Sequence, residues 1–207
     1  MNNVSEIFEI NYNNYCSQIG GIDFLHVKDK LGIEGDENRL IIPFFDRTYR
    51  ISKSDITDED GSRPGYVTCV ILAKYVLLCP DHLYEDMNWG SFKDFKKTSH
   101  FTNLNFFRSD TEHAIEKAFS GKRDVLSMAA DKLNGTRHPL HQSYDLSFQL
   151  RALPRISLLL LFNDKDEDFG AQCTVLFQKQ AEYYLDPESL AMVGSVLAGK
   201  LIKSTNP

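Results

Sequence analysis

The sequence predicts one α+β domain in which a mixed or antiparallel sheet is packed with helices and a helix closes the chain. Runs rich in β-branched and aromatic residues, each of strand length, alternate with longer stretches whose apolar residues recur at helical spacing. The chain has 207 residues, which a single domain commonly reaches (~200–250 residues). No repeat or long linker divides it, so we expect residues 1–207 to form a single domain.

The composition argues against one class of partner. Hydrophobic residues make up 42% and charged residues 25% of the chain, which is typical of a globular protein. The net charge is −6, from 29 acidic and 23 basic residues, and the basic residues form no stripe along which a phosphate backbone would bind. We therefore expect no nucleic-acid partner.

The apolar and cysteine patterns predict a cytoplasmic protein. The longest apolar runs are far shorter than the ~20 residues that cross a bilayer. The first residues show no basic stretch followed by an apolar one, as a signal peptide would. The four cysteines are scattered, which suits reduced thiols in the cytoplasm. We expect no association with a membrane.

The first half of the chain predicts helices around a hairpin. Residues 3–16 have helical apolar spacing and end near a Gly-Gly pair. Residues 40–45 and 48–52 read as the two strands of a hairpin, and Pro43 would place the first of them at an edge or a bulge. A helix over 65–79 follows a proline that suits a first helical position.

The second half predicts three strands in succession before the closing helix. Ser109 and Glu112 have capping-box spacing at the start of a helix, and Asp186 has the character of an N-cap. Residues 156–162 read as a central strand buried on both faces. The predicted elements are a short strand at 89–95, helices at 109–119 and 122–133, strands at 144–153, 156–162 and 171–177 (the last also permitting a helix), and a helix from 187.

A burst of acids between the last two predicted strands raises the question of a metal site. Asp164, Asp166 and Asp168 occupy positions 1, 3 and 5 of a possible EF-hand loop. That loop needs Gly at position 6 and Glu at position 12, where this chain has Phe169 and Val175. The EF-hand interpretation fails. A looser site for Mg²⁺ or Ca²⁺ stays open, but a solvated turn that separates two apolar strands is the favoured interpretation.

Two histidine pairings are compatible with zinc. Cys79-x-x-His82 and His138-x-x-His141 together would supply a Cys/His₃ set, but no C-x-x-C or H-E-x-x-H motif supports it. Ordinary surface histidines and an inert helix-end thiol are the favoured interpretation. The chain has no G-x-S-x-G elbow, P-loop or G-x-G-x-x-G motif, so the sequence identifies neither a catalytic residue nor a cofactor.

The last third of the chain resembles a known family. The resemblance rests on Leu153-Pro154-Arg155, the apolar strand and acidic turn that follow, Asp168-Phe169, Ala171, Leu176-Phe177 and Tyr184-Leu185. These motifs are similar to those of DUF3786, a bacterial and archaeal domain of unknown function. The chain departs from the family pattern at Asp168, where Glu is usual, and at Gly170, where Pro is common. The resemblance implies an association with anaerobic metabolism. Some relatives carry an added iron–sulfur module, for which this chain has no cysteine cluster.

These observations favour a non-catalytic domain that binds a small-molecule ligand or a protein partner. We expect its site around Arg155, whose guanidinium would fork onto a carboxylate, together with Asp145, Asp164, Asp166 and Asp168. A structural alternative is that Arg155 pairs with Asp145 or the acidic turn to hold the end of the hairpin. The alternative function is a metal-dependent hydrolase or transferase built on the scattered carboxylates and histidines.

Overall fold

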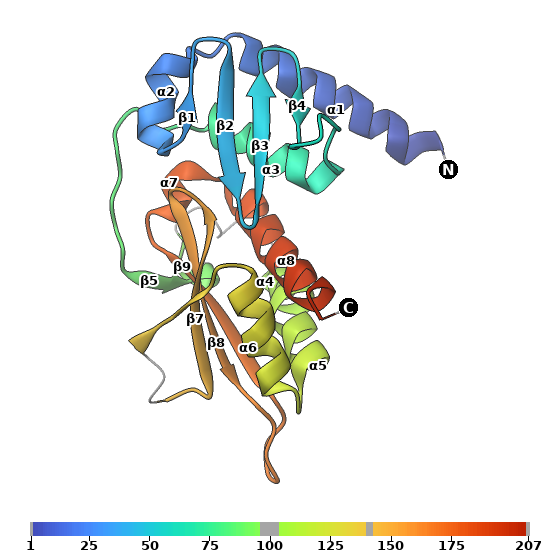
Figure 1. Cartoon of the computed structure of the whole chain (residues 1–207), viewed down its shortest axis with the longest axis vertical. Coiled ribbons are helices and arrows are strands. Elements are labelled where there is room, and N and C mark those ends of the chain that lie inside the picture. Colours follow the sequence, from blue (N-terminus) through green and yellow to red (C-terminus); the bar gives the residue numbers. More distant parts are fainter. Residues whose placement is uncertain (1, 96–103, 140–142, 206–207) are drawn as a thin grey trace.

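The computed structural model describes residues 2–95, 104–139 and 143–205. Its two sheets are both antiparallel, with strand orders β1-β2-β3-β4 and β5-β9-β8-β7-β6. The α+β class predicted from the sequence is confirmed, and of the two kinds of sheet expected the antiparallel one is present. Figure 1 shows the smaller sheet with α1, α2 and α3 above the larger one, and α8 running from one part to the other.

The elements that follow one another along the chain divide between the two sheets. The smaller sheet and its helices comprise α1 (Asn2–Gly20), α2 (Phe24–Leu31), β1 (Glu34–Gly35), β2 (Arg39–Phe44), β3 (Arg47–Ser52), β4 (Ile56–Thr57) and α3 (Tyr66–Leu77). The larger sheet and its helices comprise β5 (Trp89–Ser91), the 3₁₀ turn η1 (Phe92–Asp94), α4 (Leu104–Phe107), the π-helical η2 (Arg108–His113), α5 (Ala114–Phe119), α6 (Arg123–Lys132), β6 (Thr136–Arg137), β7 (Leu146–Leu153), β8 (Ile156–Asn163), β9 (Gln172–Gln178), α7 (Ala181–Tyr184) and α8 (Pro187–Lys203).

One continuous apolar core joins the two parts. Buried side chains of α1, α2, α3 and β2 belong to the same cluster as those of the larger sheet and α8. Helix α8 contacts α3 in the first part and α4, η2, α5 and α6 in the second. Its N-terminus forms as predicted, because the Asp186 carboxylate accepts the backbone N–H of Ser189 at 2.8 Å and Pro187 occupies the first turn.

The predicted hairpin and central strand are confirmed. Strands β2 and β3 pair around a two-residue turn, and β1 ends before it reaches Pro43, so the missing N–H of that proline faces an open edge. Strand β8 is buried on both faces from Ile156 to Phe162. Strand β9 is its antiparallel partner, which settles the choice between strand and helix for that segment.

Three local predictions were wrong or incomplete. Ser109 does not cap a helix, because it lies inside the π-helical run that continues α4. The strand predicted over 89–95 ends at Ser91, where η1 begins. A capping box is present there, between Ser91 and Asp94. Helix α2 was missed, although Asp23 caps its start and Gly32 ends it with a φ of 68°.

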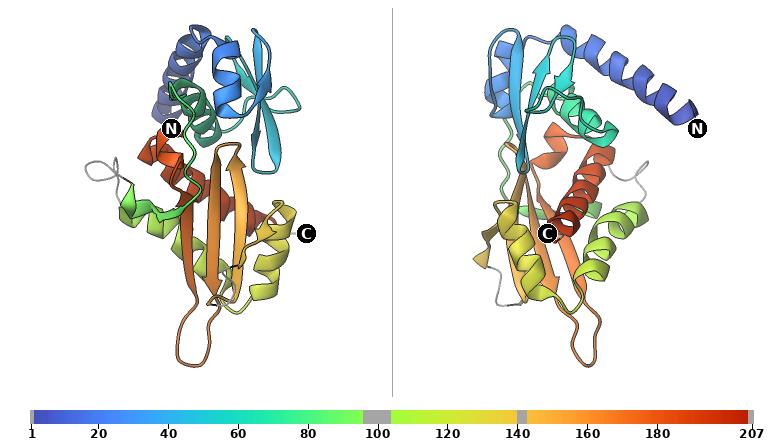
Figure 2. Two further views of the ribbon diagram at one scale, coloured as in Figure 1. Left: turned by 90° about the vertical axis from the view of Figure 1, so that its left-hand side faces the viewer. Right: turned by 45° about the vertical axis from the view of Figure 1, so that its right-hand side comes forward.

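The larger sheet has one face covered by helices and one that no helix among the described residues covers (Figure 2). Alternate residues of β8 point to each face, so Leu159 and Leu161 lie on the outer face and are nonetheless buried. Trp89 from one edge strand and His138, just after the other, lie on this face with ring centroids 5.9 Å apart. The outer face therefore carries an apolar strip beneath two side chains from opposite edges.

None of the helices in the described ranges is both long enough and apolar enough to cross a bilayer.

Candidate functional site

Arg155, the centre of the site expected from the sequence, contacts the end of α2. Its Nε and an Nη donate to the carbonyl oxygens of Lys30 and Asp29, at 2.9 and 3.1 Å. These are among the last carbonyls of α2, where the regular helical hydrogen bonds end; the Asp29 carbonyl also accepts the N–H of the capping residue Gly32 at 3.2 Å. The contact with Glu85 is long, at 4.0 Å. Arg155 thus fastens the hairpin turn of the larger sheet to the end of α2. The structural alternative in which it pairs with Asp145 or the acidic turn is not what the structure shows, since Asp145 contacts Arg123 and Asp164 instead.

Two of the predicted acids lie together at the far end of the β7–β8 pair. An Asp145 oxygen accepts the backbone N–H of Asp164 at 2.7 Å. Asp164 in turn accepts the N–H groups of Gly121 and Arg123, at 2.6 and 3.3 Å, just before α6. Its carboxylate therefore holds the α5–α6 connection against the hairpin. The interpretation of the acids as a solvated turn is therefore incomplete for Asp164, which also contacts the α5–α6 connection.

The remaining acids of the burst do form a local turn. Asp166 accepts the N–H groups of Asp168 and Phe169 through one oxygen, at 2.9 and 2.7 Å, as an Asx turn does. Asp168 and Phe169 are exposed. These bonds satisfy the backbone of the hairpin loop and require no ion.

The residues considered for zinc are not brought together. Cys79 lies just after α3, beyond its C-cap Leu78, and burial raises the pKa of its thiol. His82 is exposed in the same connecting segment. His138 packs against Trp89, and His141 lies outside the described residues. Within residues 2–95, 104–139 and 143–205, no group of three or more His, Cys, Asp or Glu side chains is placed to hold a metal ion.

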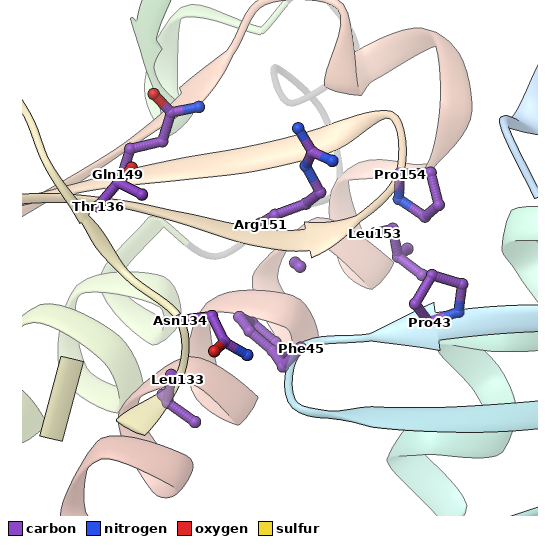
Figure 3. A pocket seen from close by; sticks show the side chains of 10 residues that line it. Pro43, Phe45, Leu133, Asn134, Thr136, Gln149, Arg151, Leu153 and Pro154 are labelled. Carbon is purple, nitrogen blue, oxygen red and sulfur yellow. The ribbon is translucent and has the colours of Figure 1, made fainter. Parts of the chain in front are cut away.

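A cavity of about 300 Å³ lies where the two sheets meet (Figure 3). We call it the junction cavity. Its volume is at the lower end of the range for small-molecule sites. It is lined by residues of the β2–β3 hairpin, the end of α6, and strands β6 and β7: Pro43, Phe45, Leu133, Asn134, Thr136, Gln149, Arg151, Ala152, Leu153 and Pro154.

The junction cavity combines apolar walls with one cation. Figure 3 shows the side chains of Gln149 and Arg151 projecting from one side of β7, whereas Phe45 and Asn134 lie on the other side of that strand. The guanidinium of Arg151 makes no hydrogen bond or ion pair with any residue that the structure describes, and the residue is exposed. Its charge is therefore available to a ligand, and a guanidinium suits a carboxylate or phosphate in particular.

Backbone irregularities shape this cavity. Phe45 and Asn134 both have positive φ, at 54° and 57°, a conformation that is uncommon outside glycine. Between Arg151 and Leu153 the β7–β8 register shifts, so that Ala152 is an extra residue. Such irregularities often gather at functional sites. None of them is visible in the hydrophobic pattern, so the sequence did not point to this place.

A second cavity, of about 740 Å³, lies beside β9 and the π-helical run. Glu112 and Glu116 line it and accept the backbone N–H groups of Val175 and Cys173, at 3.0 and 2.9 Å. Burial raises the pKa of the Glu112 carboxyl, and the Val175 hydrogen bond opposes that rise. The thiol of Cys173 has a pKa well above its ordinary value because it is buried. The two glutamates thus accept hydrogen bonds from the part of β9 that β5 is too short to pair with. The raised pKa makes the Cys173 thiol a poor nucleophile.

Comparisons with known proteins place the chain in a family without assigning an activity. The model of DUF3786, described as a domain of unknown function, matches residues 23–200. No curated protein and no solved structure matches the chain. The matched region contains every element from α2 onward, including both cavities and most of α8, whereas α1 precedes it. The chain therefore belongs to the DUF3786 family.

Proposed function

We propose that this protein is a non-catalytic, cytoplasmic domain that binds a small anionic ligand in the junction cavity. The observation that carries the proposal is the guanidinium of Arg151, which has no hydrogen-bond or ion-pair partner among residues 2–95, 104–139 and 143–205, at a cavity whose other lining residues are apolar or uncharged. Binding sites of this kind are mostly apolar, with a few polar groups that fix the orientation of the ligand. A carboxylate or phosphate attached to a small apolar group fits this combination.

Two further expectations complete the proposal. All four cysteines are free thiols, which supports a reducing compartment such as the cytoplasm. The resemblance to DUF3786 suggests work beside the enzymes of anaerobic metabolism. In that setting the domain would respond to the level of a metabolite.

The alternative, a metal-dependent hydrolase or transferase, has one observation in its favour. The cavity beside β9 holds two carboxylates, and one of them has a raised pKa, as acid–base groups often do. Both carboxylates are, however, engaged by backbone N–H groups of β9. This arrangement supports a structural role better than a catalytic one.

Native mass spectrometry of protein purified without oxygen tests the proposal first. We expect an acidic small molecule at one equivalent, bound to wild type and absent from Arg151→Gln. Arg39→Gln is the matched control, since Arg39 is an exposed strand arginine outside the cavity. A stoichiometric metal ion bound instead would favour the enzyme.

Probe anions test the same site without knowing the ligand. Inorganic phosphate and benzoate, at constant ionic strength, should raise the melting temperature of wild type and of Arg39→Gln. Loss of a charge-assisted hydrogen bond (~1.5–3 kcal/mol) should weaken binding to Arg151→Gln by about tenfold or more. Equal responses of the wild type and Arg151→Gln would reject the proposal.

A further inference from the structure

A third cavity, of about 450 Å³, lies at the opposite edge of the larger sheet. We call it the aromatic–acidic cavity. Strand β5 and the segment before it supply one side, and the connection from β9 into α7 supplies the other. The residues that matter here are Asp86, Trp89, Asp94, Lys179, Glu182 and Tyr183.

The aromatic walls of this cavity are held in place before any ligand arrives. The ring of Tyr183 stacks on that of Tyr84, with centroids 4.0 Å apart and an interplanar angle of 2°. The hydroxyl of Tyr184 fixes the backbone of Tyr84 by donating to its carbonyl at 3.0 Å and accepting its N–H at 3.1 Å. The backbone of Trp89 is fixed by its place in β5, and its ring contacts the ring of His138, with centroids 5.9 Å apart. Binding would therefore cost little ordering of these walls.

The charges around the cavity are predominantly negative. Three carboxylates line it, from Asp86, Asp94 and Glu182, against the single ammonium of Lys179. Asp86 uses one oxygen to accept the N–H of Asn88 at 3.1 Å, and Asp94 uses one to accept the N–H of Ser91 at 3.3 Å. These local bonds hold the carboxylates of Asp86 and Asp94 in place at the cavity.

Together the two features select an organic cation. The faces of tryptophan and tyrosine attract a cation within ~6 Å of the ring centroid, and tryptophan does so best. A Ca²⁺ ion would instead need six to eight oxygen ligands, and the two aromatic rings would contribute nothing to it. We propose that the aromatic–acidic cavity binds the ammonium group of a small organic cation, between Trp89 and Tyr183.

Lys179 provides a variant that should bind the cation more tightly than wild type. Its side chain crosses Gly90 so closely that a Cβ at Gly90 would lie 3.2 Å from Lys179 Cγ. Its ammonium is the one positive charge in the lining, so it competes with a bound cation. Removing that charge should strengthen cation binding, which a variant that merely damages the fold would not do.

The test uses the fluorescence of Trp89, the chain's only tryptophan. Wild type is titrated with tetramethylammonium chloride, with sodium chloride of equal ionic strength as reference and tert-butanol as an uncharged probe of similar shape. We expect a saturable change in emission with tetramethylammonium alone. Asp86→Asn combined with Asp94→Asn, which keeps both hydrogen-bond acceptors, should weaken binding by about tenfold or more. Lys179→Met should tighten it.

Asp81→Asn is the matched control, because Asp81 is an exposed acid of the same connecting segment and does not line the cavity. It should titrate like wild type, and so should Arg151→Gln, so the outcome is independent of the junction cavity. The proposal is overturned if folded wild type shows no saturable response. It is also overturned if tert-butanol gives the same response, or if Lys179→Met binds more weakly.

Discussion

The backbone N–H of Phe45 donates a hydrogen bond of 2.8 Å to the carbonyl oxygen of Ala152. The bond links the tip of the β2–β3 hairpin to the bulge of β7, where Ala152 is the residue without a partner in the strand ladder. The bulge therefore frees a carbonyl that holds the two sheets together. The same contact places Phe45 in the wall of the junction cavity, so the geometry of the cavity depends on how the sheets are joined.

Gly194 permits the close packing of α8 against α4 and the π-helical run. A Cβ at this position would lie 2.6 Å from a Phe107 ring carbon and 2.7 Å from Thr111 Oγ1. We expect Gly194→Ala to reduce the free energy of unfolding by about 1–3 kcal/mol, as overpacking does. Urea denaturation measures this directly.

Gly199, on the same helix, is the matched control. A Cβ there would meet nothing within 4 Å, so Gly199→Ala should stabilise the protein by up to ~1 kcal/mol through helix propensity. Equal effects at the two glycines would contradict this account of the packing.

Arg155 should contribute to stability through α2. Arg155→Met removes the hydrogen bonds to the carbonyls of Asp29 and Lys30 and should cost about 2 kcal/mol. Hydrogen exchange of the α2 amides should accelerate more than that of α8. Arg39→Met is the control, and an unchanged exchange rate in α2 would show that Arg155 does not hold its end.

Glu112 should make stability depend on pH. Burial raises the pKa of its carboxyl above the ordinary value of 4.5. The stability that follows from the raised pKa is fully present below pH 4.5 and is lost as pH rises through the folded-state value. Glu112→Gln keeps an acceptor for Val175 and cannot ionise, so it should gain stability relative to wild type as pH rises.

Urea unfolding at about pH 4 and about pH 7 measures that difference. Glu167→Gln, at an exposed acid of the β8–β9 loop, controls for the loss of one charge. If the stability difference between Glu112→Gln and wild type is the same at both pH values, ionisation of Glu112 is not responsible.

The acids of the β8–β9 loop should contribute unequally to the stability of the protein. Asp164→Ala leaves the N–H groups of Gly121 and Arg123 without their acceptor and should cost about 1 kcal/mol, as loss of a cap does. Asp168→Ala, which is exposed, should change stability by less than ~0.5 kcal/mol. Thermal melting in EDTA and in excess Mg²⁺ or Ca²⁺ should give the same ranking; a rise of several degrees with a metal in wild type alone would show an ion site.

The sequence predicted the elements whose signal is local. The apolar run of β8 and the Asp-Pro start of α8 each report a strand or a helix within a few residues, and both were confirmed. Helix α2 carried similar signals in Asp23 and Gly32, but it is short and was missed. Ser109 shows the opposite error, since its capping-box spacing lies within a run that tertiary packing keeps helical.

The candidate sites could not be predicted in the same way, because each depends on residues far apart in the chain. Arg151 reads in sequence as an ordinary solvent-facing residue of an alternating strand. It becomes notable only because it lines a cavity to which Phe45 and Asn134 contribute from other parts of the chain. Arg155 was singled out by its neighbours in sequence, whereas its partners lie in α2, more than a hundred residues earlier.

The place of α8 in the core has a consequence for how the protein is made. The ribosome releases α1, α2, the smaller sheet and α3 long before α8, yet α3 packs against α8. The carbonyl of Lys30 at the end of α2 likewise lacks its hydrogen bond until Arg155 has been synthesised. We therefore expect a nascent chain to carry exposed apolar surface on α3 until α8 has left the exit tunnel. We expect the first part to complete its folding only once Arg155 and α8 are available to pack against it.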